Sequence, residues 1–417
     1  MTESEKWKRT ALLVIDMQND CIREDGPVRV NGGKAILPNV IEAVQVARQR
    51  GILIIWVVRE HDPKGRDVEL FRRHLYGDGK LGPVIKGSLG AELVEGLVIK
   101  EEDYKLVKTR FSAFFNTHLH SVLQGAGIDS LVITGVQTPD CIRQTVFDAV
   151  ALDYPSLKVI VDATAAATPE IHTVGCVHVQ GYIEKVDKFY KLHPSPMPAL
   201  SFQNDDYKCN SVAVPVALLW KAMAEKWNHT ALLVIDMQTD FIHEDGHVRV
   251  NGGKAIVPNV IAAVQVARQR GILVIWVVRE HDPKGRDVEL FRRHLYHDGK
   301  LGPTVKGSLG AELVEGLVIK EGDYKLVKTR FSAFFNTHLH SVLQGAGIDS
   351  LVITGVQTPN CIRQTVFDAV ALDYPSVKVI VDATAAATPE VHAANIFDMK
   401  NVGVATPTLK EWSEHDA

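Results

Sequence analysis

The sequence predicts an α/β protein built from two tandem three-layer α/β/α domains of the Rossmann-like class, each with a mostly parallel sheet of about six strands. The chain has 417 residues, which is too long for one ordinary compact domain. Residues 5–172 recur as residues 225–392 with sixteen differences over 168 positions, and a repeat of that length indicates duplicated domains and not a solenoid. Within each copy, apolar runs alternate with segments of helical apolar spacing, which favours a parallel sheet covered by helices.

The elements of copy one follow from its apolar pattern. Continuous apolar runs predict buried strands at residues 11–15, 52–58, 104–108, 131–136 and 159–161. Apolar residues at helical spacing predict helices at residues 38–50, 91–97, 116–124 and 139–151. Pro38 near the start and Gly51 just past the end are typical punctuation of the first of these helices.

The repeat ends abruptly, and this end sets the expected domain boundaries. We expect copy one at residues 5–172, a linker or foreign segment at 173–224, and a complete copy two at 225–417. Copy two adds a predicted helix at 389–400 and a predicted sixth strand at 402–405, both lost from copy one. Residues 174–183 are a candidate for a replacement strand. We therefore predict that copy one is the less stable half.

Composition and charge exclude several classes of protein. Lys and Arg number 46 against 50 Asp and Glu, for a net charge of −4, so the basic footprint of a nucleic-acid binder is missing. No apolar run approaches the roughly 18 residues that span a bilayer, and residues 1–10 lack the apolar core of a signal peptide. Five cysteines without a CxxC pair argue against a disulfide framework and a structural zinc site. We expect a cytoplasmic protein that acts on a small molecule, with no nucleic-acid or membrane partner.

Three residues capable of catalysis stand at the ends of predicted strands. Asp16 follows the first strand of copy one, Lys108 ends the third, and Cys141 follows the fourth. Their counterparts in copy two are Asp236, Lys328 and Cys361. Because sites in open α/β sheets form beyond the carboxyl ends of the strands, we expect each trio to share one cleft.

The residue types of this trio suit nucleophilic catalysis. Thr138 is a suitable N-cap and Pro139 a suitable first helical residue, so the sulfur of Cys141 is expected in the first turn of a helix, where the dipole favours a thiolate. Lys108 can supply a nearby cation, and Asp16 can orient that lysine and accept the thiol proton. Each residue also has a plain structural interpretation: a small buried hydrophobe, a solvated charge and a loop cap.

The ordered motifs DMQND, KTRFSAF and GVQTPDC resemble those of the isochorismatase-like cysteine hydrolases, the superfamily that includes nicotinamidases, and in particular plant nicotinamidase-like proteins. The resemblance implies an Asp–Lys–Cys triad, which the two trios match residue for residue. It also implies a cis peptide before the nucleophile, here Val136–Gln137 and Val356–Gln357, which aims backbone amides at the substrate and makes Gln137 and Gln357 candidate substrate-binding residues. Copy two has Phe241 where the family stacks an aromatic residue on the substrate, whereas copy one has Cys21.

The chemistry implied by the resemblance is hydrolysis of a C–N bond in a small amide or carbamoyl compound through a thioester. Nicotinamidases hold a metal through an Asp-x-His segment and a further His, but the corresponding residues 59–63 read REHDP. We therefore expect no metal, and because the segment around Gly32-Gly33-Lys34 lacks the spacing of a phosphate-binding loop, no cofactor.

Three further possibilities stay open at this point. The chain can be a catalytically inactive nicotinamidase-like protein that binds a small molecule or serves in assembly. The two copies can also pair within one chain as a pseudo-dimer. A redox-sensing role lacks an obvious resolving cysteine beside either nucleophile.

Overall fold

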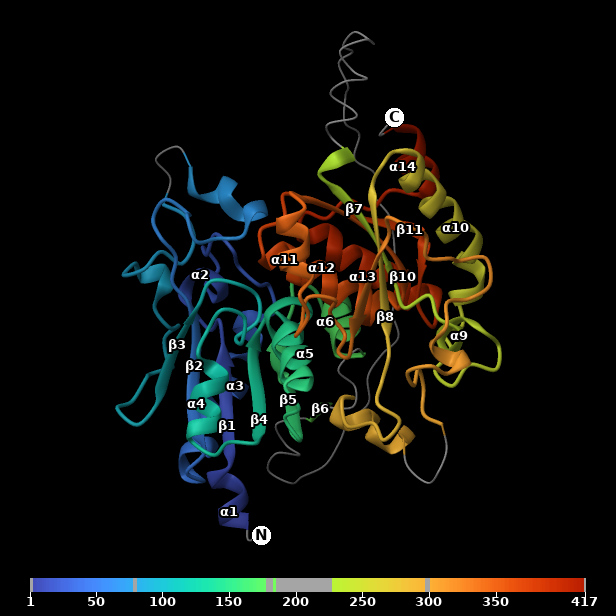
Figure 1. Ribbon diagram of the computed structural model, residues 1–417. Coiled ribbons are helices and arrows are strands. Elements are labelled where there is room, and N and C mark those ends of the chain that lie inside the picture. The colour runs from blue at the N-terminus through green and yellow to red at the C-terminus, as the bar shows by residue number, and fades with distance from the viewer. Residues whose placement is uncertain (1–2, 78–80, 178–182, 185–226, 297–300, 416–417) are drawn as a thin grey trace. The chain divides into compact units, whose positions relative to one another are not determined.

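The computed structural model describes residues 3–77, 81–177, 183–184, 227–296 and 301–415, and the chain forms two compact units, one around each copy of the repeat (Figure 1). In copy one the strands are all parallel and lie in the order β3-β2-β1-β4-β5-β6. Their bounds are β1 Thr10–Ile15, β2 Leu53–Arg59, β3 Tyr104–Lys108, β4 Ser130–Val136, β5 Ser156–Ala165 and β6 Ile183–Glu184.

Copy two repeats the same parallel sheet with five strands in the order β11-β10-β7-β8-β9. These strands are β7 Thr230–Ile235, β8 Leu273–Arg279, β9 Tyr324–Lys328, β10 Ser350–Val356 and β11 Ser376–Ala385. The predicted fold class is therefore confirmed: a duplicated, Rossmann-like α/β domain with a parallel sheet flanked by helices.

The helical segments connect the strands in the same sequence in both copies. In copy one they are α1 Glu3–Lys8, α2 Asn19–Ile22, α3 Gly33–Gln49, η1 Leu70–Tyr76, η2 Leu89–Ala91, α4 Leu119–Gly125, η3 Thr138–Ile142, α5 Arg143–Ala151 and α6 Pro169–Val177. In copy two they are α9 Thr239–Ile242, α10 Gly253–Gln269, η5 Leu290–Tyr296, η6 Leu309–Ala311, α11 Leu339–Gly345, η7 Thr358–Ile362, α12 Arg363–Ala371, α13 Pro389–Asn401 and α14 Leu409–His415.

Both faces of the copy-one sheet are covered. The chain moves from β1 to β2 in one direction and from β4 to β5 in the other, so right-handed crossovers place α3 and α5 on opposite faces. On the α3 face, Val40 and Ala43 of the helix pack with Trp56 of the sheet, and all three are fully buried. On the opposite face Leu13 and Ile133 are equally buried. A strand buried on both faces has to be apolar throughout, which explains the continuous runs in the sequence.

One predicted helix, residues 91–97, is wrong. Only the short turn η2 precedes this segment, which then runs without helix alongside the loop that follows β1. The N–H group of Val94 donates to the carbonyl of Met17, and the side chain of Gln18 donates to the carbonyl of Ala91. These bonds to a distant loop take the backbone groups that a helix would have used, and tertiary context overrides the helical spacing.

The predicted sixth strand of copy two is reduced to one bridge, between Lys378 and Ala405. Ala405 exchanges two backbone hydrogen bonds with β11, and the carbonyl of Pro407 accepts a third from Val381. Proline has no N–H group, so the ladder cannot continue through this position. In copy one the candidate strand at 174–183 is also mostly wrong, because α6 extends to Val177 and the strand begins only at Ile183.

The complete C-terminus of copy two buries an additional tryptophan. Trp412 of α14 is 1% exposed and belongs to the core, where the guanidinium of Arg270 lies between the rings of Trp412 and Trp227, at 5.4 and 4.5 Å from their centroids. In copy one, Arg50 covers Trp7 at 4.5 Å, and Trp7 is only partly buried.

We predict that Trp412→Ala lowers the unfolding free energy of copy two by about 3–5 kcal/mol, because it removes a fully buried aromatic side chain. Hydrogen exchange in urea should show this loss in peptides that contain β7 and not in those that contain β1, which are distinguishable because residue 19 is Asn and residue 239 is Thr. Phe397→Ala, at an aromatic side chain that is 48% exposed, is the control. Equal effects of the two substitutions would contradict the assignment of Trp412 to the core.

Candidate active site

Four adjacent strands deliver the central residues of the site from their carboxyl ends. In the order β3, β2, β1 and β4, these strands end at or just before Lys108, Arg59, Asp16 and Cys141. Parallel strands end at one edge of the sheet, so four residues far apart in the sequence converge there. Copy two repeats the arrangement with Lys328, Arg279, Asp236 and Cys361.

The predicted trio makes direct contact in both copies. The ammonium Nζ of Lys108 lies 2.8 Å from Asp16 Oδ2 and 3.3 Å from Cys141 Sγ. The corresponding distances from Lys328 to Asp236 and to Cys361 are also 2.8 and 3.3 Å. Lys108 is 1% exposed and Asp16 is 3% exposed, which excludes the interpretation of the lysine as a solvated surface charge.

The backbone at Asp16 adopts an uncommon conformation that directs this carboxylate. Its φ is 53°, in the left-handed region that costs a residue with a side chain roughly 1–2 kcal/mol, and Asp236 has the same φ. The N–H group of Asp16 donates to the carbonyl of Val57 on the neighbouring strand β2 at 2.9 Å, which holds the turn in place. The strain occurs at the residue that orients the lysine, as is typical of functional sites.

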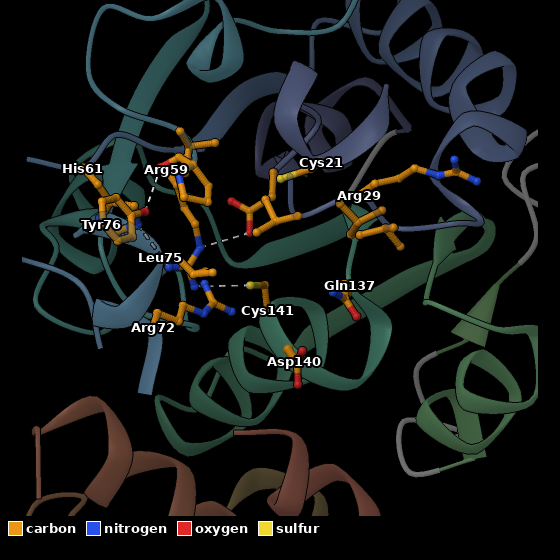
Figure 2. A pocket seen from close by; sticks show the side chains of 16 residues that line it. Cys21, Arg29, Arg59, His61, Arg72, Leu75, Tyr76, Gln137, Asp140 and Cys141 are labelled. Carbon is orange, nitrogen blue, oxygen red and sulfur yellow. Dashed lines mark hydrogen bonds and ion pairs between the residues drawn. The ribbon is translucent and has the colours of Figure 1, made fainter. Parts of the chain in front are cut away.

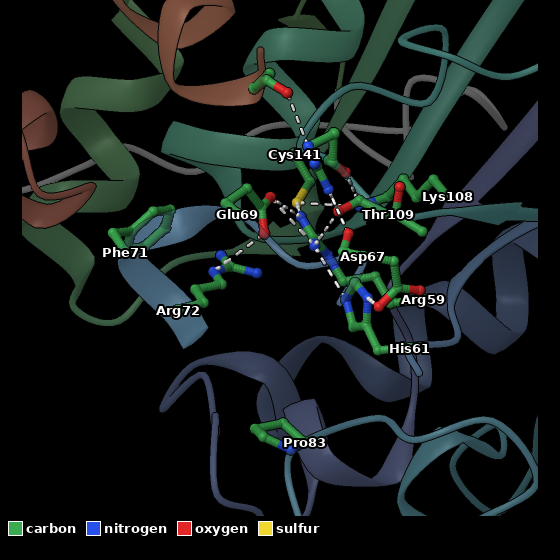
Figure 3. A network of polar contacts seen from close by, with 12 residues as sticks. Arg59, His61, Asp67, Glu69, Phe71, Arg72, Pro83, Lys108, Thr109 and Cys141 are labelled. Carbon is green, nitrogen blue, oxygen red and sulfur yellow. Dashed lines mark hydrogen bonds and ion pairs between the residues drawn. The ribbon is translucent and has the colours of Figure 1, made fainter. Parts of the chain in front are cut away.

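Arg59 is a second buried cation beside the sulfur. Its Nη2 lies 3.7 Å from Cys141 Sγ, its Nε lies 3.6 Å from Asp16 Oδ2, and both Nη atoms lie 3.4 Å from Glu69 Oε1. Burial lowers the pKa of Arg59, but the charges of Glu69, Cys141 and Asp16 outweigh burial and raise it well above its ordinary value. Glu69 is fully buried, and the nearby Arg59 overcomes its burial and lowers its pKa to about 2. Figure 3 shows this network around Cys141.

His61 belongs to the same network as a neutral side chain. It is 1% exposed, and burial together with the charge of Arg59 lowers its pKa to about 4. Arg59 can only donate, so the imidazole Nε2, 3.5 Å from Arg59 Nη1, is the acceptor. The proton of the neutral ring then sits on Nδ1, which faces Asp67 Oδ1 at 3.4 Å.

The charge balance around Cys141 holds the resting group as a thiol. Burial raises the pKa of this thiol, and the carboxylate of Asp16 raises it further, whereas Lys108 and Arg59 lower it. Asp16 Oδ1 has no hydrogen-bond partner among the described residues, so this oxygen is available to accept a proton. The arrangement therefore suits proton transfer from sulfur to carboxylate more than a permanent thiolate.

Cys141 lines a pocket of about 270 Å³ in copy one, although its side chain is only 4% exposed (Figure 2). Gln137, Asp140 and Cys21 lie on the wall of the same pocket. Cys21 is buried, and burial raises the pKa of its thiol to about 12, so it remains protonated near neutral pH. A second cysteine thus shares the pocket of copy one, which the spacing of the sequence did not reveal.

The nucleophile turn differs in detail from the expected helix start. Thr138 does not cap the helix, because its hydroxyl is bonded to His172 Nδ1 at 2.8 Å, and the residue before it, Gln137, takes the N-cap position. Cys141 lies in one π-helical turn, η3, that precedes α5. The amides of Asp140 and Ile142 both donate to the carbonyl of Gln137, so they are engaged within the turn.

The remaining residues that the sequence singled out have these positions. The peptide bonds Val136–Gln137 and Val356–Gln357 are cis. Phe241 is 6% exposed and belongs to the hydrophobic core of copy two. Gln357 accepts a 3.4 Å hydrogen bond from the side chain of Asn360, the residue that replaces Asp140. The roles of these residues toward a substrate remain predictions.

The residues at the expected metal position do not fit a metal ion. Among the described residues, no group of three or more His, Cys, Asp or Glu side chains is placed to hold one. The ring nitrogen of His61 that points into the network faces the guanidinium of Arg59, a cation where a metal would need a ligand. His74, the other candidate, is exposed and bonds the carbonyl of Phe71 through Nδ1.

Sequence reasoning missed Arg59, His61 and Glu69 as parts of the site. Arg59 ends the second predicted strand, so the strand-end rule that singled out Asp16, Lys108 and Cys141 also applies to it. Glu69 follows no strand and carries no motif, and only the fold brings it to Arg59.

Comparison with known proteins follows this geometry. A model of the isochorismatase domain matches residues 10–186 and 230–411, and the chain therefore belongs to the isochorismatase family and carries its domain twice. A protein of Arabidopsis thaliana described as a probable inactive nicotinamidase is 74% identical over 193 residues, which are 46% of this chain and 98% of that protein.

Solved structures of family members are similar to one copy at a time. An isochorismatase family protein from Desulfovibrio vulgaris is 42% identical, covers 45% of this chain and 97% of its own, and has a TM-score of 0.44. A pyrazinamidase of Pyrococcus horikoshii in complex with zinc is 26% identical, covers 43% and 99% of the two chains, and has a TM-score of 0.39. No helix within the described ranges has the length and apolar character needed to cross a membrane.

We predict that Asp16→Asn accelerates alkylation of Cys141 by iodoacetamide about threefold near pH 7. Removing the negative charge lowers the thiol pKa, and a fall of about one unit gives roughly tenfold more thiolate, each about threefold less nucleophilic. The same substitution should abolish turnover if Asp16 accepts the thiol proton. Mass spectrometry distinguishes the two active-site peptides because residue 140 is Asp and residue 360 is Asn. Slower alkylation in this variant would refute the charge balance described above.

We also predict that acidification destabilises copy one through His61. The folded state holds this imidazole neutral with a pKa of about 4, whereas the unfolded chain takes up a proton near 6.5. The stabilisation is thus complete above pH 6.5 and declines as the pH falls towards 4, by about 3 kcal/mol in total. His61→Gln should flatten this pH dependence in urea unfolding followed by hydrogen exchange, while the exposed His74→Gln should leave it unchanged.

Proposed function

We propose that the chain is a cysteine hydrolase that cleaves a C–N bond in a small amide or carbamoyl compound through a thioester. The observation that carries this proposal is the contact of one sulfur, one ammonium and one carboxylate at the edge of a pocket, with the same distances in the second copy. The family membership of the chain supports a hydrolytic reaction on a small molecule.

In the first half of the reaction, Cys141 attacks the carbonyl carbon while its proton passes to Asp16. The new C–S bond moves the carbonyl electrons onto oxygen. When these electrons return, the C–N bond breaks, and the nitrogen leaves as an amine with the proton held by Asp16. Lys108 stays protonated throughout; it holds the carboxylate at 2.8 Å and stabilises negative charge on the sulfur at 3.3 Å.

In the second half, water attacks the thioester carbon and transfers a proton to Asp16. Collapse of the adduct breaks the C–S bond, and the proton returns to the sulfur, which restores the thiol and releases the acid. The net reaction consumes one water and yields an acid and an amine. No metal takes part in these steps, since the residues around His61 do not fit one.

A catalytically inactive protein that binds a small molecule is the second candidate. It is favoured by the 74% identical relative, which is described as a probable inactive nicotinamidase. The raised pKa of Cys141 also means that the resting sulfur is a weak nucleophile. In this alternative the pocket still binds its ligand, but no acyl group is transferred to sulfur.

The test is release of ammonia or amine from a panel of small amides and ureides. We expect that Cys141→Ala and Cys361→Ala each remove part of the activity and that the double variant loses at least about 10³-fold, because no other nucleophile can form the thioester. Cys176→Ala, at a buried cysteine that does not line the pocket, should retain activity.

Intact-mass measurement after acid quenching separates the two candidates. A hydrolase should accumulate an acyl adduct on the peptide of Cys141 or Cys361 with a slow substrate. Ligand-induced thermal stabilisation without adduct or amine release across the panel would favour the inactive alternative.

A further inference from the structure

Arg72 is a partly exposed cation on the wall of the active-site pocket. It belongs to η1 and lines the same pocket as Cys141 and Asp16 (Figure 2). Its side chain is 26% exposed, in contrast to the buried Lys108 and Arg59. A solute that enters the pocket can therefore reach this guanidinium.

Aromatic rings fix the position of this guanidinium. Its central carbon lies 5.2 Å from the ring centroid of Phe71 and 5.3 Å from that of Phe111, and these two rings stack with centroids 6.0 Å apart and an angle of 11° between their planes. Stacking restrains the plane of an arginine without using its N–H donors.

The acidic partner of Arg72 does not occupy these donors. Its Nε lies 3.9 Å from Glu69 Oε2, beyond hydrogen-bond distance, and that oxygen has no hydrogen-bond partner among the described residues. An arginine carries five N–H donors in a planar fork that matches a carboxylate. The geometry thus holds a preorganised fork at the pocket whose donors remain available.

The charges of the pocket leave one positive charge in excess. Its lining contains three arginines and two aspartates, namely Arg29, Arg59, Arg72, Asp16 and Asp140. His61 is also on the wall but is neutral near pH 7, because its pKa is about 4. Behind the wall, Lys108 and Glu69 carry opposite charges and leave this sum unchanged. One anionic group on the substrate would neutralise the excess.

We propose that the substrate is an amide or carbamoyl compound that also carries a carboxylate, such as a ureido acid or the half-amide of a dicarboxylic acid, and that Arg72 binds this carboxylate while the carbonyl carbon faces Cys141. This inference rests on the proposed function, because it assigns the substrate class of the same site. Copy two carries the same element: Arg292 Nε lies 3.7 Å from Glu289 Oε2, and its guanidinium lies 5.2 Å from the centroid of Phe291.

The test compares isosteric substrate pairs that differ in one charge: succinamate against butanamide, and N-carbamoylglycine against ethylurea. The full chain should hydrolyse the anionic member with the higher kcat/KM. Arg72→Gln combined with Arg292→Gln should lower the anionic-to-neutral ratio of kcat/KM by about 10- to 100-fold, as expected for the loss of a charge-assisted contact. Restoring charge with lysine at both positions should recover part of the ratio.

Matched controls are available in the adjacent arginines. Arg73 and Arg293 are exposed and lie in the same elements, so Arg73→Gln with Arg293→Gln removes the same total charge and should leave the ratio unchanged. An equal fall of both rates in the Arg72 variant would overturn the proposal, because the excess charge would then serve the sulfur and not the substrate.

A binding measurement separates failure of this inference from failure of the proposed function. In the chain with Cys141→Ala and Cys361→Ala, succinamate should raise the melting temperature more than butanamide does, and the difference should vanish when Arg72→Gln and Arg292→Gln are added. This outcome supports the carboxylate site even if no amine is released by the unmodified chain. Hydrolysis without a preference for the anionic substrates would keep the proposed function and refute the carboxylate site.

Discussion

The site depends on a set of buried charges that neutralise one another. Lys108 and Arg59 are opposed by Asp16 and Glu69, all nearly inaccessible to solvent, at the ends of the central strands. Removing one member of such a set would leave an uncompensated buried charge, which is far more costly than removing the whole set. The cluster therefore ties the fold to the chemistry: the sheet holds the charges in place, and the charges adjust how readily Cys141 loses its proton.

Arg59 makes this cluster different from a simple triad. A guanidinium stays charged at any accessible pH and offers donors in several directions. Here it contacts sulfur, two carboxylates and the neutral His61 at once. It fills the space toward which the imidazole points, so the segment that would bind a metal in a nicotinamidase instead supplies positive charge through the protein itself.

Much of the fold could be read from the sequence because its signals were local. Buried strands are continuously apolar, and the strand-end rule brought Asp16, Lys108 and Cys141 into one place. The rest depended on contacts that spacing does not encode. The segment at 91–97 has helical spacing, yet bonds to the loop after β1 extend it. Glu69 and Arg72 approach the sulfur only because the long connection between β2 and β3 folds back over the edge of the sheet.

The near identity of the two copies has a consequence for assembly of the chain. Strands β1 and β7 have the same sequence, TALLVI, and β4 and β10 share SLVITGV. Each strand would find nearly the same neighbours in the other copy's sheet, so exchanging equivalent strands sacrifices little packing energy. Correct pairing then depends on how soon each copy closes its own sheet, and a chain that completes one copy before the other emerges from the ribosome avoids the wrong partners.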